Sequence, residues 1–103
     1  MSTIRAVRVE TCGAAEQMTV QAIPESAPGP KEVRIRMSAC GINLIDTYHR
    51  SGLYPLPLPT GLGCEGAGVV DAVGEGVDDL VVGDRVAFAM AMGAYAESIV
   101  LPR

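Results

Sequence analysis

The chain has 103 residues, a formal net charge of −4 and a pI near 4.8, and its eight basic residues are scattered along the sequence. A protein that binds a nucleic-acid backbone needs a basic stripe, and none is visible here. The longest uncharged stretch near the C-terminal end, residues 86–96, falls short of the roughly 20 residues of a transmembrane helix. We therefore expect one domain with neither nucleic acid nor a membrane as its partner.

The cysteine pattern and the N-terminus point to a cytoplasmic protein. The three cysteines lack the spacing of a metal ribbon, and their odd number suits reduced thiols. No apolar segment of the kind found in signal peptides follows Met1.

Glycine and proline are frequent, which predicts short strands joined by turns. The clearest alternation lies at residues 33–39, where Val33, Ile35 and Met37 alternate with polar side chains, as in a half-buried strand. Further strands are expected at residues 4–9, 17–23, 68–73, 80–88 and 95–101, with Gly83 and Asp84 in a tight turn that Asp84 fixes by capping backbone amides. The proline-rich residues 53–59 should be extended and irregular. This pattern predicts a mainly β protein, either a small barrel or a sandwich.

Residues 43–54 combine polar groups with an otherwise apolar stretch. The polar side chains are Asn43, Asp46, Tyr48, Arg50 and Tyr54. Burying such groups costs on the order of 1–3 kcal/mol each unless each finds a partner. About two helical turns at residues 43–50 would place Asn43, Asp46 or Thr47, and Arg50 on one side. Two interpretations stay open: a binding or catalytic site, and a short amphipathic helix with a solvated polar face.

The segment from Gly61 to Gly66 fits the pattern G-x-G-x-x-G. A dinucleotide-binding loop requires a strand before it and a helix after it. Here a proline-rich loop precedes the glycines and a β-rich run follows them, so we expect no nucleotide site. We expect the glycines to allow a sharp bend and close packing instead.

Four ordered segments resemble the zinc-independent quinone oxidoreductases of the medium-chain dehydrogenase/reductase superfamily. They span residues 39–55 (ACGINLIDTYHRSGLYP), 61–68 (GLGCEGAG), 73–86 (VGEGV and VGDRV) and 93–97 (GAYAE). The resemblance implies a partly open GroES-like β-barrel with a short helix, incomplete relative to the full catalytic domain. Residues 1–103 would be the N-terminal part of that domain. The nucleotide-binding Rossmann domain would be absent from this chain, because family members are about three times as long.

The resemblance also implies a reaction and a cofactor, with NADPH expected and NADH as the alternative. A hydride would pass from the nicotinamide to a quinone or enone, and a neutral donor would stabilise the oxyanion that forms. The implied catalytic residues are Asn43, Tyr48 and Tyr54, and the implied cofactor-binding residues are Asn43, Asp46, Tyr48 and Arg50. A local ion pair between Asp46 and Arg50 is expected as well. His49 is interpreted as a surface residue, and Tyr95 and Glu97 as structural residues of a strand.

Zinc-dependent relatives prompt the question of a metal. Cys40, Cys64 and Glu65 could in principle ligate zinc. A catalytic zinc usually takes three protein ligands, and in those relatives another comes from beyond residue 103. We therefore expect no metal, and we interpret the two cysteines as small core residues.

Three alternatives remain at this point. The chain could belong to an enoyl-thioester reductase, it could be a non-enzymatic co-chaperonin-type assembly module, or it could be a stand-alone binding module. As part of a reductase, the 103 residues alone should be inactive. Unpaired strand edges would favour a homo-oligomer.

Overall fold

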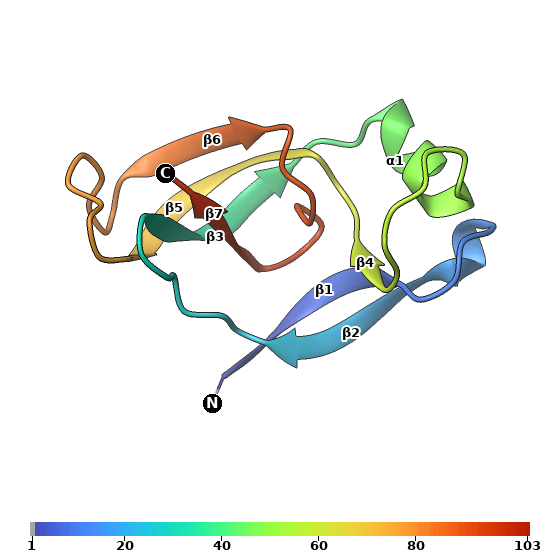
Figure 1. Cartoon of the computed structure of the whole chain (residues 1–103), viewed down its shortest axis with the longest axis horizontal. Helices are drawn as coiled ribbons and strands as arrows, with labels where there is room; N and C mark the ends of the chain where they lie inside the picture. Colours follow the sequence, from blue (N-terminus) through green and yellow to red (C-terminus); the bar gives the residue numbers. More distant parts are fainter. Residues whose placement is uncertain (1) are drawn as a thin grey trace.

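The computed structural model describes residues 2–103, and its strands form two antiparallel sheets (Figure 1). The smaller sheet has the order β2-β1-β4, with β1 at Thr3–Val9, β2 at Met18–Pro24 and β4 at Thr60–Gly61. A single 3-10 turn, η1 at Ala15–Gln17, connects β1 to β2.

The larger sheet has the order β6-β5-β3-β7. Its strands are β3 at Glu32–Cys40, β5 at Glu65–Val73, β6 at Arg85–Ala89 and β7 at Ser98–Pro102. Gly68 lets β5 approach β3 closely, because a Cβ there would lie 2.1 Å from the Arg36 carbonyl oxygen. The pairing of β3 with β5 is irregular on either side of residues 35–37.

The apolar core lies on the larger sheet. Val33, Ile35 and Val70 are buried, as the alternation in residues 33–39 predicts, and half-buried side chains pack around them, including Val86, Phe88 and Leu101. Burial at about 25 cal/mol per Å² of apolar surface is the main force that holds this sheet together.

Residues 93–97 connect the two sheets. The Val7 N–H donates to the Tyr95 carbonyl at 2.8 Å, and the Glu97 N–H donates to the Arg5 carbonyl at 3.0 Å. On the other side, the Met37 N–H donates to the Glu97 carbonyl at 2.9 Å. The sheets thus meet along one side, and within residues 2–103 they do not close into a barrel, which confirms the mainly β, partly open architecture.

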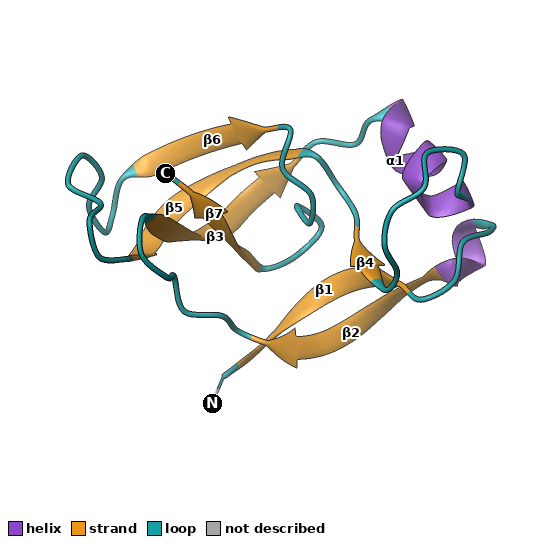
Figure 2. Cartoon of the chain, viewed as in Figure 1, coloured by secondary structure: helices purple, strands orange, loops and turns teal. Residues whose placement is uncertain are grey.

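One short α-helix, α1 at Leu44–Ser51, lies between β3 and β4 (Figure 2). Asn43 precedes it in extended conformation, and Gly52 ends it with a φ of 91°, a left-handed conformation that glycine adopts at little cost. The expected helix at residues 43–50 is therefore confirmed to within a residue at each end. Within residues 2–103, no helix is long and apolar enough to cross a bilayer.

Two strands begin later in the structure than the sequence predicts. Residues 80–84 form a turn in which the Val81 N–H donates to Asp84 Oδ2 at 3.0 Å, so β6 begins only at Arg85. The capping role of Asp84 is confirmed. Residues 95–97 precede β7, because their backbone groups bond to both sheets rather than to one neighbouring strand.

Candidate functional site

A cavity of about 540 Å³ opens beside the first turns of α1. Asn43, Asp46, Thr47 and Arg50 line it from the helix, which confirms that these residues share one side. Apolar side chains and residues of the neighbouring strands and loops complete the lining: Val7, Met18, Cys40, Ile42, Leu62, Tyr95 and Ala96. Its size and mixed lining are typical of small-molecule sites.

Asp46 is the centre of the hydrogen bonds at this cavity, and only 5% of its surface is exposed. Its Oδ2 accepts the Asn43 backbone N–H at 3.0 Å and the Tyr95 hydroxyl. Its Oδ1 accepts the Cys64 thiol at 3.8 Å. The carboxylate therefore fixes the start of α1 relative to the 93–97 segment and to the beginning of β5.

Tyr95 reaches Asp46 from the segment that connects the sheets. Gly63 makes room for its ring: a Cβ at residue 63 would lie 2.6 Å from Tyr95 Cδ1, and the φ of Gly63 is +94°. The Tyr95 N–H also donates to the Leu62 carbonyl at 2.9 Å. The sequence-based interpretation of Tyr95 as a strand residue missed its side chain's contact with Asp46, which no local pattern reveals.

The environment of Asp46 keeps its two side-chain donors protonated. Burial, followed by the hydrogen bond to Asp46, raises the pKa of the Tyr95 phenol above its usual value. Burial, followed by the charge of Asp46, likewise raises the pKa of the Cys64 thiol. Near neutral pH both groups are therefore neutral donors to a carboxylate.

Arg50 lines the cavity but does not pair with Asp46. Its Nε donates to the Gly13 carbonyl at 3.2 Å, and the Gly13 N–H donates to the Arg50 carbonyl at 3.0 Å. The expected Asp46–Arg50 ion pair is thus wrong: Asp46 is occupied by donors from elsewhere in the fold, and Arg50 anchors the loop after β1.

The two tyrosines of the predicted site do not line this cavity. Tyr48 and Tyr54 form an edge-to-face pair with ring centroids 5.2 Å apart, and the lining of the 540 Å³ cavity includes neither. Of the predicted site residues, the structure therefore brings Asn43, Asp46 and Arg50 together at the cavity. Tyr48 and Tyr54 lie outside it.

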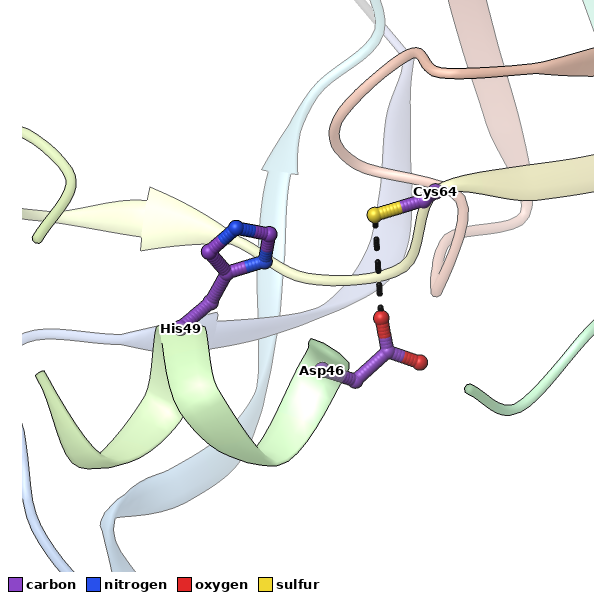
Figure 3. A group of neighbouring side chains, drawn as sticks. All are labelled: Asp46, His49 and Cys64. Atoms are coloured by element: carbon purple, nitrogen blue, oxygen red, sulfur yellow. Dashed lines mark hydrogen bonds between the residues drawn. The ribbon is translucent and has the colours of Figure 1, made fainter. Parts of the chain in front are cut away.

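A second cavity, of about 510 Å³, adjoins the other side of Asn43 and is lined by His49, Cys64 and Met90, among others. His49 is 8% exposed, so its interpretation as a surface residue is wrong. It lies three residues after Asp46 on the buried side of α1, and a helical wheel could have indicated this. Asp46, His49 and Cys64 turn toward one another (Figure 3), and their potential ligand atoms all lie within 4.8 Å of one another.

The ligand set considered from the sequence does not assemble in the same way. Within residues 2–103, the group with metal-ligand spacing contains Cys64 but neither Cys40 nor Glu65. Cys40 is exposed, which corrects its interpretation as a core residue, and Cys64 is half-buried against Asp46. Cys40 ends β3 beside the first cavity, where the strand leaves the packed sheet.

The glycine motif at residues 61–66 runs from β4 directly into β5. A strand follows it where a dinucleotide loop requires a helix N-terminus, so the expected β-strand after the motif is confirmed. Its glycines serve close packing instead, as Gly63 does against Tyr95.

Comparisons with known proteins place these observations in a family. Residues 29–103 match the alcohol dehydrogenase GroES-like domain. A quinone oxidoreductase of Pseudomonas aeruginosa is 55% identical over 91 residues, which cover 86% of this chain and 28% of that protein. A 2-haloacrylate reductase of a Burkholderia species is 37% identical over 105 residues, covering 96% of this chain and 31% of that protein.

Among solved structures, the Escherichia coli quinone oxidoreductase in complex with NADPH superposes with a TM-score of 0.91 at 41% identity. The match covers 94% of this chain and 30% of that one. The chain thus spans about three tenths of the length of the relatives it matches. The resemblance to quinone oxidoreductases that the sequence motifs carry is confirmed.

Proposed function

The chain belongs to the alcohol dehydrogenase GroES-like domain family, and from that premise we propose that it forms the substrate-facing part of an NAD(P)H-dependent quinone oxidoreductase. The observation that carries the proposal is the 540 Å³ cavity, in which Asn43, Thr47 and Arg50 face apolar side chains such as Leu62. A planar quinone and a nicotinamide ring both suit an apolar surface with few polar groups.

The lining fits the nicotinamide end of the cofactor. An amide and a hydroxyl can bond the carboxamide of the ring, and the apolar side chains can pack on its face. When bound, NADPH supplies the hydride. The chain's own part is to hold the substrate carbonyl near Asn43 and Arg50 and to exclude water from the apolar side of the cavity.

Asn43 is the proposed donor to the substrate oxygen. An amide stays neutral near pH 7 and can direct an N–H at the negative charge that develops there. Asp46 positions Asn43 through the 3.0 Å bond to its backbone N–H, and the side-chain NH2 group of Asn43 can then donate to the substrate. Tyr48 and Tyr54 remain predicted hydrogen-bond donors to a substrate that extends beyond the cavity along α1.

The proposed hydride step uses no metal ion, because the nicotinamide carries the redox chemistry and neutral donors can stabilise the oxyanion. The nucleotide-binding part of the enzyme is proposed to come from outside these 103 residues, since their one G-x-G-x-x-G segment leads into β5. By themselves they are expected to be inactive.

The test compares variants in the full-length protein that carries this chain. Oxidation of NADPH by 1,4-benzoquinone is followed by absorbance for wild type, Asn43→Ala and Ser38→Ala. Replacing Asn43 removes the proposed donor but keeps the backbone N–H that Asp46 accepts, so kcat/KM should fall about 10²–10³-fold. Ser38 is exposed on β3 and outside the cavity lining, so its variant should match wild type. Equal activity of Asn43→Ala and wild type would contradict the proposed role.

A second substrate class is an alkene conjugated to a carbonyl. The 2-haloacrylate reductase is 37% identical to this chain, and the same donor could stabilise the enolate that hydride addition to such an alkene produces. Assays with an enone and with 2-chloroacrylate beside the quinone rank the classes by kcat/KM. A higher kcat/KM for the enone or for 2-chloroacrylate than for the quinone would favour the alkene class.

A further inference from the structure

Asp46, His49 and Cys64 form a group of metal-ligating side chains that the proposed hydride transfer does not require as a group. Asp46 and His49 are three residues apart on α1 and therefore project from the same face of the helix. Cys64 is the residue that immediately precedes β5. One carboxylate oxygen, one imidazole nitrogen and the sulfur lie within 4.8 Å of one another (Figure 3).

A second observation points to a missing partner at this place. The Nδ1 atom of His49 is buried and makes no hydrogen bond within residues 2–103, and the side chain as a whole is more than nine-tenths buried. Leaving such an atom without a partner costs about 1–3 kcal/mol. Figure 3 shows this nitrogen on the side of the ring that faces Asp46 and Cys64, so a cation between the three groups would satisfy it.

The donor set indicates which cation would bind. Thiolate and imidazole prefer zinc and similar borderline-soft divalent metals, whereas magnesium and calcium prefer oxygen ligands. Metal–ligand bonds of about 2.0–2.3 Å put neighbouring donors about 3.3–3.7 Å apart in a tetrahedral site. Side chains now within 4.8 Å need to approach by about 1 Å to reach that spacing.

We propose that Asp46, His49 and Cys64 form a binding site for one divalent transition-metal ion of the zinc class. Asp46 Oδ1, His49 Nδ1 and Cys64 Sγ are the ligands, and a water completes the coordination. The site shares only Cys64 with the ligand set considered from the sequence, and it revises the expectation that the chain holds no metal.

The hydrogen bonds around Asp46 support this assignment. Oδ2 accepts hydrogen bonds from the Asn43 N–H and the Tyr95 hydroxyl, and among residues 2–103 the Cys64 thiol is the only donor to Oδ1. On binding, the S–H bond breaks, its proton leaves to solvent, and a sulfur–metal bond forms, while both contacts at Oδ2 remain. Hydrogen bonds to the second oxygen of a ligating carboxylate are a common feature of metal sites.

The first test uses cobalt(II) as a spectroscopic probe of purified protein that has been treated with a chelator and a reductant. Titration with CoCl₂ should give a thiolate-to-cobalt charge-transfer band that saturates at one ion per chain. The band should disappear in Cys64→Ser and weaken in His49→Gln. It should persist in Cys12→Ser, which changes a cysteine outside the group. Tyr95→Phe should lower cobalt affinity about 10–100-fold, because it removes a bond to the ligating carboxylate.

A second measurement needs no variant and therefore does not depend on a variant's folding. With ZnCl₂ present, alkylation of Cys64, read by peptide mass spectrometry, should slow at least tenfold, while Cys12 and Cys40 react as before. Absence of the cobalt band, its persistence in Cys64→Ser, or unchanged alkylation of Cys64 would each overturn the site. Neither readout involves NADPH or a quinone, so the metal site and the proposed reductase function can fail independently.

Discussion

The four-stranded sheet and the region around α1, here called the helix side, bury side chains of opposite polarity. In the sheet, aliphatic side chains such as Val33, Ile35 and Val70 are buried and polar side chains face outward. Around α1 the polarity is reversed: Asp46 and His49 are buried, whereas Ile42 and Leu44 are 87% and 68% exposed. The sheet thus gains its stability from apolar area. The helix side spends stability on holding polar groups in fixed positions, which is typical of functional sites.

The largest expected effect comes from the core of the sheet. Ile35→Ala should lower the free energy of unfolding by about 2–5 kcal/mol, because it removes buried methyl groups and leaves a cavity. Ile42→Ala is the matched control on the helix side and should change it by less than about 0.5 kcal/mol. Urea denaturation measures both. Similar losses in the two variants would show that the exposed apolar side chains of the helix side are buried in solution.

Removing Asp46 tests whether the helix side depends on polar contacts. Asp46→Ala leaves the Tyr95 hydroxyl and the Asn43 N–H without their acceptor, and should cost about 1–3 kcal/mol in urea denaturation. Asp78→Ala, which removes an exposed carboxylate, provides the baseline. If Asp46→Ala were as stable as that control, water would be replacing the carboxylate at little cost.

Tyr95 should make stability depend on pH in the alkaline range. Its pKa is raised in the folded protein, so the folded state retains a proton that the unfolded chain has lost above about pH 10. Stability contributed by Tyr95 is fully present below that pH and decreases as the pH rises, by at most about 1.4 kcal/mol per pH unit. Tyr95→Phe should remove this part of the decrease, and Tyr54→Phe should not. Identical alkaline profiles for wild type and Tyr95→Phe would contradict the prediction.

The smallest effect concerns the reactivity of Cys64. Burial and then the charge of Asp46 raise the pKa of its thiol, and only the thiolate reacts with iodoacetamide. Asp46→Asn removes the charge but keeps the volume, so alkylation of Cys64 at pH 8 should be faster than in wild type. The exposed Cys40 serves as an internal reference in the same digest. An unchanged rate of alkylation would mean that burial alone controls the thiol.

The sheet was largely predictable from sequence because its signal is local. The alternation at residues 33–39 identifies the buried side of β3, and Gly83 with Asp84 marks a turn. The predictions failed where backbone groups bond outside a regular sheet. Residues 95–97 have the composition of a strand, yet they bond to β1 and β3 from the connection between the sheets.

The site was predictable only in part. Asn43, Asp46 and Arg50 repeat at helical spacing, so their common side of α1 followed from the sequence. The partners of Asp46 did not, because Cys64 and Tyr95 are far away along the chain and come close only through the fold. The spacing of Asp46 and Arg50 alone favoured an ion pair between them. In the structure the Asp46 carboxylate instead accepts hydrogen bonds from donors far along the chain, and Arg50 donates to the Gly13 carbonyl.

The close contact between Gly63 and the Tyr95 ring has a consequence for recombination among relatives. Any side chain at residue 63 would meet the ring at residue 95, and that ring bonds to Asp46. A chimera with its crossover between residues 63 and 95 takes these partners from different parents. It should tolerate a Tyr95 ring only where the parent that supplies residue 63 carries glycine there. Crossovers in the turn at residues 81–84 still separate the pair. Junctions that keep residues 46–95 in one block keep Asp46, Gly63 and Tyr95 from one parent.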